Sequence, residues 1–386
     1  MNMKCVMNFQ ELPLWTGVKI EKTEPVTRPF SISWDERGFI KQTTSSEVTR
    51  EVVKNYADAT YSFITARPGE STWGTYMGNK NINYIKEQII NLEGLNILEI
   101  GAGNLYLAEY FTTFEGVSKY TVIDPAVENY KVEKIEAIQG YFTAELTKEE
   151  KYDLVLSINC LEHIPDPIEF LKEIRTLLIR SQGKALLIFP DIEEQFYTGD
   201  LNALLHEHIS YFSFEGMKKI LDSLGLNIIK GETDGVGMKF LLECRQLKKI
   251  SDINILEMDV LLPIGIANFQ KNIIQIREEF REIMGKKNKV YFHGATNGLN
   301  NILYLTGLYN EENIFVIDSD EMKQGKYLPC CKNPILHIED IKELKIETVY
   351  VSACSFFDSI EKYYIENHGM KSSSIKKLFE NSVREL

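Results

Sequence analysis

Two carboxylates and a glycine-rich turn form the clearest ligand-binding pattern in the sequence. Gly101 and Gly103 follow the apolar run 96–100, and glycine permits both a positive φ and a close approach of a ligand to the backbone. The helical pattern that follows offers its N-terminal N–H groups to the same ligand. Asp124 ends the next apolar run, where an acidic side chain can accept hydrogen bonds from ribose hydroxyls. The pattern indicates a nucleotide-like ligand, and a tight structural turn without a ligand is the alternative.

A pyrophosphate does not suit this turn. A dinucleotide fingerprint would need a third glycine at position 106, which is Tyr106. A nucleoside without phosphate therefore fits better, and a nicotinamide-dependent dehydrogenase becomes the weaker enzymatic alternative. Glu99 supports a ligand as well, because a carboxylate inside an apolar run is costly to bury without a partner.

The composition is that of a globular protein without attraction to polyanions. The 386 residues are 44% hydrophobic, and the formal net charge of −13 disfavours nucleic acid and anionic membranes as partners. The N-terminal residues lack the form of a signal peptide, and no run reaches the about 18 apolar residues of a membrane span. The six cysteines contain no C-x-x-C pair. We expect a cytoplasmic protein that has no structural zinc and keeps its fold under chelation.

Three regions of the chain differ in pattern. Residues 1–90 are mixed, and no fold is assigned to them. Residues 91–250 alternate short β-branched runs with helical periodicity, which is typical of a doubly wound, mostly parallel sheet with helices on its faces. Residues 251–386 begin with a long helical pattern and continue into a second, smaller alternating unit. The predicted fold class is therefore α/β, with two such units.

The second region resembles the class I S-adenosylmethionine-dependent methyltransferases. The resemblance covers about residues 94–247 and rests on "LEIGAGN", on Asp124 and on "YDLVLSINCLEHIPDP". It implies a Rossmann-like core and S-adenosylmethionine as cofactor. In the family a residue after the third strand contacts the adenine, a place that Gln139 and Tyr141 take here, and Asn159 would face the methionine portion. The other cofactor-binding residues that the resemblance implies are Glu99, Gly101, Ala102, Gly103, Asn104 and Asp124.

A narrower resemblance is to the nucleotide-sugar C-methyltransferases of deoxysugar pathways. It rests on "LLHEHISYFSFEGMKKIL", "HGATNGLNNILYLTGL" and "FVIDSDEMKQGKYLPCCKNPIL", and it implies a nucleotide-linked sugar as acceptor and a C-terminal Rossmann-like domain. Two features depart from the family. Its N-terminal four-cysteine zinc module has no counterpart, since Cys5 is the only cysteine before Cys160, and Leu205 stands where the family commonly has tyrosine. The acceptor atom therefore stays open between carbon, oxygen and nitrogen.

Methylation of a carbon next to a ketone requires loss of a proton, so it needs a base with a pKa near neutrality and a donor to the developing oxyanion. His208 suits the base, Glu207 would orient it, and His206 could donate to the oxyanion. His163, in the loop after the fourth strand, is a further catalytic candidate or a wall of the cofactor site. Alternatively, these histidines satisfy backbone groups of their loops.

His206 and His208 form an H-x-H pair, and such a pair can also be half of a metal site. No cysteine or carboxylate cluster with ligand spacing lies near it in the sequence, so no metal is expected. A non-catalytic binding protein with the same fold is the remaining alternative to an enzyme, but such a protein would need neither the glycine turn nor Asp124. The oligomeric state is not predicted.

Overall fold

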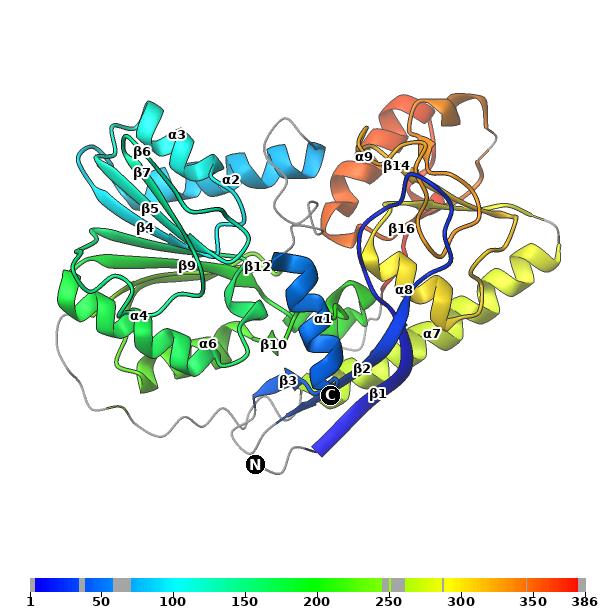
Figure 1. The fold of residues 1–386 in the computed structure, drawn as a ribbon. Coiled ribbons are helices and arrows are strands. Elements are labelled where there is room, and N and C mark those ends of the chain that lie inside the picture. The colour runs from blue at the N-terminus through cyan, green and yellow to red at the C-terminus, as the bar shows by residue number, and fades with distance from the viewer. Residues whose placement is uncertain are drawn as a thin grey trace.

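The computed structural model describes residues 4–34, 39–57, 71–244, 250, 261–286, 288–344 and 346–380. Strands within these ranges form three sheets, of four, eight and five strands, in N-terminal, central and C-terminal parts of the chain (Figure 1). The predicted boundary at residue 250 adjoins residues 251–260, which lie outside the described ranges.

The eight-stranded sheet contains the glycine-rich turn. Its strand order is β11-β12-β9-β8-β4-β5-β7-β6, with β4, β5, β7, β8 and β9 parallel and β6, β11 and β12 antiparallel to their neighbours. The strands are β4 (Asn96–Ile100), β5 (Lys119–Asp124), β6 (Tyr130–Val132), β7 (Ile135–Gln139), β8 (Leu154–Ile158), β9 (Lys184–Pro190), β11 (Asn227–Thr233) and β12 (Gly237–Glu243). The chain order reverses on either side of β4, which is where ligands bind in open α/β sheets.

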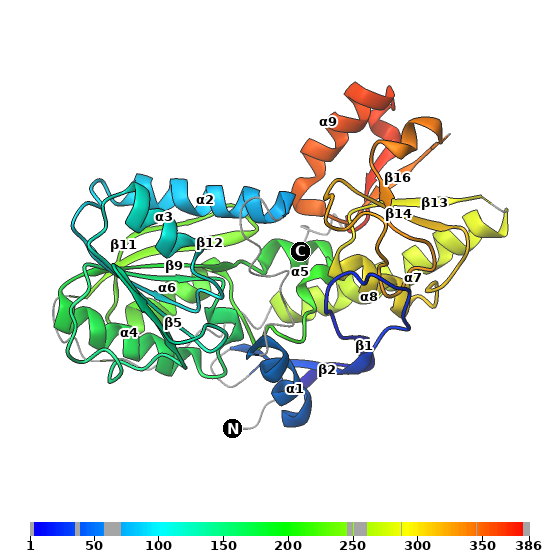
Figure 2. The same cartoon turned by 45° about the horizontal axis from the view of Figure 1, so that its top comes forward.

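Helices cover both faces of this sheet, as Figures 1 and 2 show. The helices on its faces are α2 (Thr72–Gln88), α3 (Tyr106–Phe114), α4 (Pro167–Ser181) and α6 (Phe214–Ser223), whereas α5 (Glu193–Thr198) packs on helix α7 (Leu261–Gly285). Successive strand residues point to opposite faces, so Ile97 packs in the core cluster with α2 and α3, whereas Leu98 packs in the cluster with α4 and α6. Helix α4 begins at Pro167 behind an Asp166 cap and ends where Gln182 adopts a φ of 57°.

The N-terminal segment forms an antiparallel sheet with the order β1-β2-β3-β10. Its strands are β1 (Lys4–Pro13), β2 (Thr27–Trp34), β3 (Ile40–Gln42) and β10 (Ser210–Tyr211), and helix α1 (Ser46–Ala57) follows β3. Strand β10 comes directly after the loop that carries His206, Glu207 and His208, which we call the H-x-H loop. The N-terminal sheet is therefore joined to the loop that carries the predicted base.

The C-terminal unit is a parallel sheet with the order β15-β14-β13-β16-β17. Its elements are α7 (Leu261–Gly285), β13 (Val290–His293), α8 (Asn297–Leu305), β14 (Ile314–Asp318), β15 (Leu336–His337), β16 (Val349–Val351), α9 (Phe357–His368) and β17 (Ile375–Lys377). The 3-10 helices of the described residues are η1 (Leu161–His163), η2 (Leu201–Ala203), η4 (Asp340–Glu343), η5 (Cys354–Phe356) and η6 (Ser372–Ser374).

Buried asparagines bind the C-terminal unit to the central one. The side-chain amide of Asn301 donates to the carbonyl oxygens of Leu201 and Leu204 at 3.2 and 3.0 Å, and the Gly298 N–H donates to Asn202 Oδ1 at 2.6 Å. Residues 201–204 lead directly into the H-x-H loop. The C-terminal unit therefore holds the segment that leads into that loop.

Among the helices that the structure describes, none combines the length and apolar content required to cross a bilayer.

Candidate active site

The loop after β4 needs glycine for two reasons. Gly101 and Gly103 have φ values of 75° and 66°, a region that residues with a side chain rarely adopt. A Cβ atom on Gly101 would also overlap Cys160 Sγ and lie 2.7 Å from Cys160 Cβ. The backbone of this loop is thus packed directly against the segment that follows β8.

Asp124 holds the glycine loop in place. Its side chain is fully buried at the end of β5, where Oδ2 accepts the Gly103 N–H at 2.8 Å and Oδ1 accepts the Ala126 N–H at 2.6 Å. Such bonds to a carboxylate are about twice as strong as neutral ones. The structure therefore adds a loop-bracing role for Asp124 to its predicted contact with ribose.

Glu99 is buried inside β4 with a partner that sequence reasoning missed. Its side chain is buried, and Tyr120 on β5 donates its hydroxyl to Glu99 Oε2 at 2.8 Å. Burial, with nearby Asp124 adding to it, raises the pKa of the Glu99 carboxyl to about 8. Burial therefore disfavours the charged form of this carboxyl.

The other predicted cofactor residues lie at the carboxyl ends of neighbouring strands. Ala102 and Asn104 belong to the glycine loop, where Asn104 Oδ1 accepts the Tyr106 N–H at 2.9 Å. Gln139 ends β7 opposite Asp124, and Asn159 follows β8 with a φ of 49°. Because β8, β4, β5 and β7 are adjacent and parallel, the structure brings these residues to one edge. Tyr141, two residues beyond β7, is 62% exposed.

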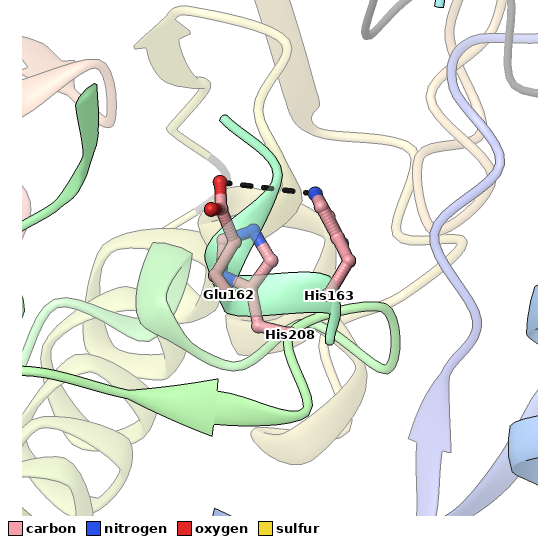
Figure 3. A group of neighbouring side chains, drawn as sticks. All are labelled: Glu162, His163 and His208. Carbon is pink, nitrogen blue, oxygen red and sulfur yellow. Dashed lines mark ion pairs between the residues drawn. The ribbon is translucent and has the colours of Figure 1, made fainter. Parts of the chain in front are cut away.

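A second cluster forms where η1 meets the H-x-H loop. The ligand atoms of Glu162, His163 and His208 all lie within 4.8 Å of one another (Figure 3). Glu162 Oε1 is 3.7 Å from His163 Nε2, and the two imidazole rings meet edge to face with centroids 5.2 Å apart. The histidine expected after the fourth strand and the expected base are thus brought together, across 44 residues of chain.

Backbone hydrogen bonds hold this cluster together. The Ile209 N–H donates to the Glu162 carbonyl oxygen at 2.8 Å, and His163 Nδ1 lies 2.9 Å from the Glu207 carbonyl oxygen. Because a carbonyl oxygen only accepts, the hydrogen of a neutral His163 lies on Nδ1. These two bonds fix the H-x-H loop against η1.

Gln42 is the second residue that sequence reasoning missed. It ends β3, and its side-chain Nε2 lies 3.2, 3.0 and 3.1 Å from the carbonyl oxygens of Leu205, His206 and His208. Its backbone N–H donates to the Ile209 carbonyl oxygen at 2.9 Å. No local signal marks Gln42, because its partners lie more than 160 residues later in the chain.

Burial dominates the electrostatics of the cluster. It raises the pKa of the Glu162 and Glu207 carboxyls to about 8, and it lowers the pKa of His163 and, with His163 adding to it, of His208. Among the described residues, Oε2 of Glu162 and Oε2 of Glu207 have no hydrogen-bond partner. Burial therefore disfavours the charged form of each of these four groups.

His206 points to a different neighbourhood. Its ring packs edge to face on Phe30 of β2, with centroids 5.2 Å apart, and its Nε2 lies 3.4 Å from the Arg28 carbonyl oxygen. Burial lowers the pKa of His206 to about 4. The structure thus places His206 against the N-terminal sheet and does not group it with Glu162, His163 and His208.

Two family models match separate parts of the chain. The family described as "Methyltransferase domain" matches residues 75–230, which include the glycine loop, η1 and the H-x-H loop. The protein is a class I S-adenosylmethionine-dependent methyltransferase. The family described as "C-methyltransferase C-terminal domain" matches residues 258–372 of this methyltransferase, so it resembles the C-methyltransferases in its C-terminal unit as well.

The methyltransferase is similar to enzymes of two kinds. C-methyltransferase NovU from Streptomyces niveus is 25% identical over 315 residues, which are 75% of this chain and 74% of NovU. Ubiquinone biosynthesis O-methyltransferase from Haemophilus ducreyi is 29% identical over 110 residues, which are 25% of this chain and 46% of that protein. The solved DhpI–SAH complex is 15% identical, covers 53% of this chain and 100% of its own, and aligns with a TM-score of 0.38.

The cofactor of the methyltransferase is S-adenosylmethionine, and the edge of the central sheet fits it. Gly101 and Gly103 have the positive φ values that a tight turn at this edge requires. The buried carboxylate of Asp124 stands at the next strand end. The individual contacts of the nine cofactor-binding residues named from the sequence stay predictions.

Replacing Asp124 by alanine should weaken S-adenosylmethionine binding by at least about 1.5 kcal/mol, roughly tenfold in affinity, because charge-assisted hydrogen bonds to the loop and to ribose are lost. Isothermal calorimetry measures this. Asp153→Ala is the matched control, since Asp153 Oδ2 also accepts a backbone N–H, that of Asn96 at 2.8 Å, but at the opposite end of β4. Equal affinities of a folded Asp124→Ala variant and the wild type would contradict the assignment.

Proposed function

We propose that this methyltransferase methylates a carbon atom of a sugar carried on a nucleotide, and that the Glu207–His208 pair removes the proton from that carbon. Two similarities support the proposal: the match of residues 258–372 to a C-methyltransferase C-terminal domain, and the similarity to NovU over three quarters of the chain. The observation that carries the mechanism is the H-x-H loop, which is clamped against η1 immediately after β8, the strand next to the glycine loop.

The bound cofactor supplies a methyl group on a positively charged sulfur, which becomes a neutral thioether when the methyl leaves. The residues of the chain have to position the acceptor and accept its proton. When the Glu207–His208 pair takes the proton, the C–H electron pair becomes available to form the new carbon–carbon bond. Glu207 is buried and His208 is half-buried, and the hydrogen bonds from Gln42 and His163 hold the backbone of both residues in place.

The test uses cofactor with an isotopically labelled methyl group and a panel of nucleotide-linked keto and hydroxy sugars. We expect label to enter a keto sugar, and NMR should show a methyl group bonded to the carbon beside the carbonyl. A reaction without acceptor and a panel of the free sugars serve as controls. Transfer to none of the nucleotide-linked sugars would overturn the proposed acceptor.

O-methylation of a small metabolite is the second candidate. It is favoured by the partial match to ubiquinone biosynthesis O-methyltransferase and by Leu205, which departs from the C-methyltransferase pattern. A methyl signal on oxygen in the same NMR experiment would select it. An oxygen acceptor loses its proton more easily than a carbon, so the Glu207–His208 pair would then contribute less to turnover.

A further inference from the structure

The cluster of Glu162, His163 and His208 has the composition and burial of a cation site. It combines one carboxylate and two imidazoles, from η1 and from the H-x-H loop (Figure 3). The Glu162 side chain is 4% exposed, and its Oε2 lacks a hydrogen-bond partner among the described residues. A buried carboxylate oxygen that is left unpaired costs free energy, so a group that binds it would stabilise the site. We propose that these three residues bind one divalent cation of the zinc class.

The surroundings of the ligands support this assignment. The His163 Nδ1 hydrogen is directed to the Glu207 carbonyl oxygen at 2.9 Å, so the lone pair of the neutral ring is on Nε2, the nitrogen that lies 3.7 Å from Glu162 Oε1. Histidines that bind metals commonly donate their other ring nitrogen in this way, which orients the ring. The loop that carries His208 is held independently by Gln42.

The ligand types select the cation. Imidazole nitrogen suits zinc, iron, cobalt and manganese better than magnesium or calcium, which prefer oxygen ligands. Two histidines and a glutamate are a ligand set of catalytic zinc sites, which keep an open coordination position. His163 and His208 are half-buried, which leaves a side of the cluster that a ligand can reach.

The role of this cation rests on the proposed function. The open position would take the carbonyl oxygen of the keto sugar and polarise it, which makes the proton on the neighbouring carbon easier to remove. With His208 bound to the cation, Glu207 is the member of the pair that accepts the proton. The proposal replaces the expectation of no metal, which rested on the lack of further ligands near the H-x-H pair in the sequence.

Cobalt(II) is the probe that tests the site. The full chain, with any tag removed, is treated with a chelator, dialysed and titrated with Co²⁺, and the visible absorption of the bound ion is recorded. We expect one Co²⁺ per chain, with competition by Zn²⁺. Removing a ligand, in Glu162→Gln or His208→Asn, should weaken binding at least about tenfold.

His206→Asn is the matched control, because His206 belongs to the same H-x-H pair but packs on Phe30, and Co²⁺ binding should be unchanged. Thermal unfolding checks that each variant is folded. Glu162→Gln and His208→Asn change different elements, so the test can be carried out with either one of them if the other does not fold. No Co²⁺ binding by the wild type, or equal binding by the wild type and a ligand variant, would overturn the proposal. The Co²⁺ titration contains neither cofactor nor acceptor, so its result does not depend on whether the proposed function is correct.

Discussion

Replacing His208 by asparagine should lower turnover at least about 100-fold, which is the low end of what acid–base assistance contributes. His208 belongs both to the proposed base pair with Glu207 and to the cluster with Glu162 and His163. Its loss should therefore slow proton removal whether His208 or Glu207 receives the proton. Cofactor affinity should stay within about threefold of the wild type, since the glycine loop and Asp124 are untouched. Steady-state kinetics on the acceptor and calorimetry with S-adenosylmethionine measure the two quantities.

Two companion variants separate a chemical role of His208 from a structural one. Glu207→Gln should also lower turnover, since it removes the carboxylate but keeps a side chain of the same size. His206→Asn changes the other histidine of the loop and should leave turnover within a fewfold of the wild type. If His208→Asn lowered thermal stability but not turnover per folded molecule, His208 would only brace its loop.

The second large effect is expected for Gly101→Ala. The new Cβ would overlap Cys160 Sγ and lie 2.7 Å from Cys160 Cβ, and the backbone φ of 75° is unfavourable for alanine. Positive φ and an overlap in a packed site each cost about 1–3 kcal/mol, so the free energy of unfolding should fall by roughly 2–6 kcal/mol. The loop has to move to relieve the overlap, so S-adenosylmethionine affinity should fall at least about 100-fold, or about 3 kcal/mol. Urea unfolding and calorimetry provide the measurements.

Gly94→Ala is the control that measures the cost of a positive φ without any side-chain overlap. Gly94 precedes β4, has a φ of 78° and would place its Cβ in open space with no atom within 4 Å. This variant should lose only about 1 kcal/mol of stability and should keep its cofactor affinity. If the two alanine variants lost the same affinity, the close packing of Gly101 on Cys160 would not be what shapes the cofactor site.

The sequence alone predicted which edge of the central sheet we expect to bind the cofactor, because the residues at that edge are marked by short-range features. Glycines after one apolar run and an aspartate at the end of the next are local signals. Parallel pairing then places the ends of consecutive strands side by side, as Ile100 does opposite Ile123. What this local pattern did not reveal was the partner of Glu99, because Tyr120 lies in a different strand and only pairing across the sheet brings its hydroxyl to the carboxyl.

Only the tertiary structure decided which residues of the H-x-H loop act together. The sequence predicted different roles for His206 and His208, but nothing nearby shows in which direction either side chain points. The direction of a loop side chain follows from its backbone torsions, and here hydrogen bonds to remote segments set them. Gln42 holds the loop carbonyls from one side, and the bond from the Ile209 N–H to Glu162 draws His208 toward His163. His206 packs on Phe30 instead, so the cluster exists only once three distant segments have folded together.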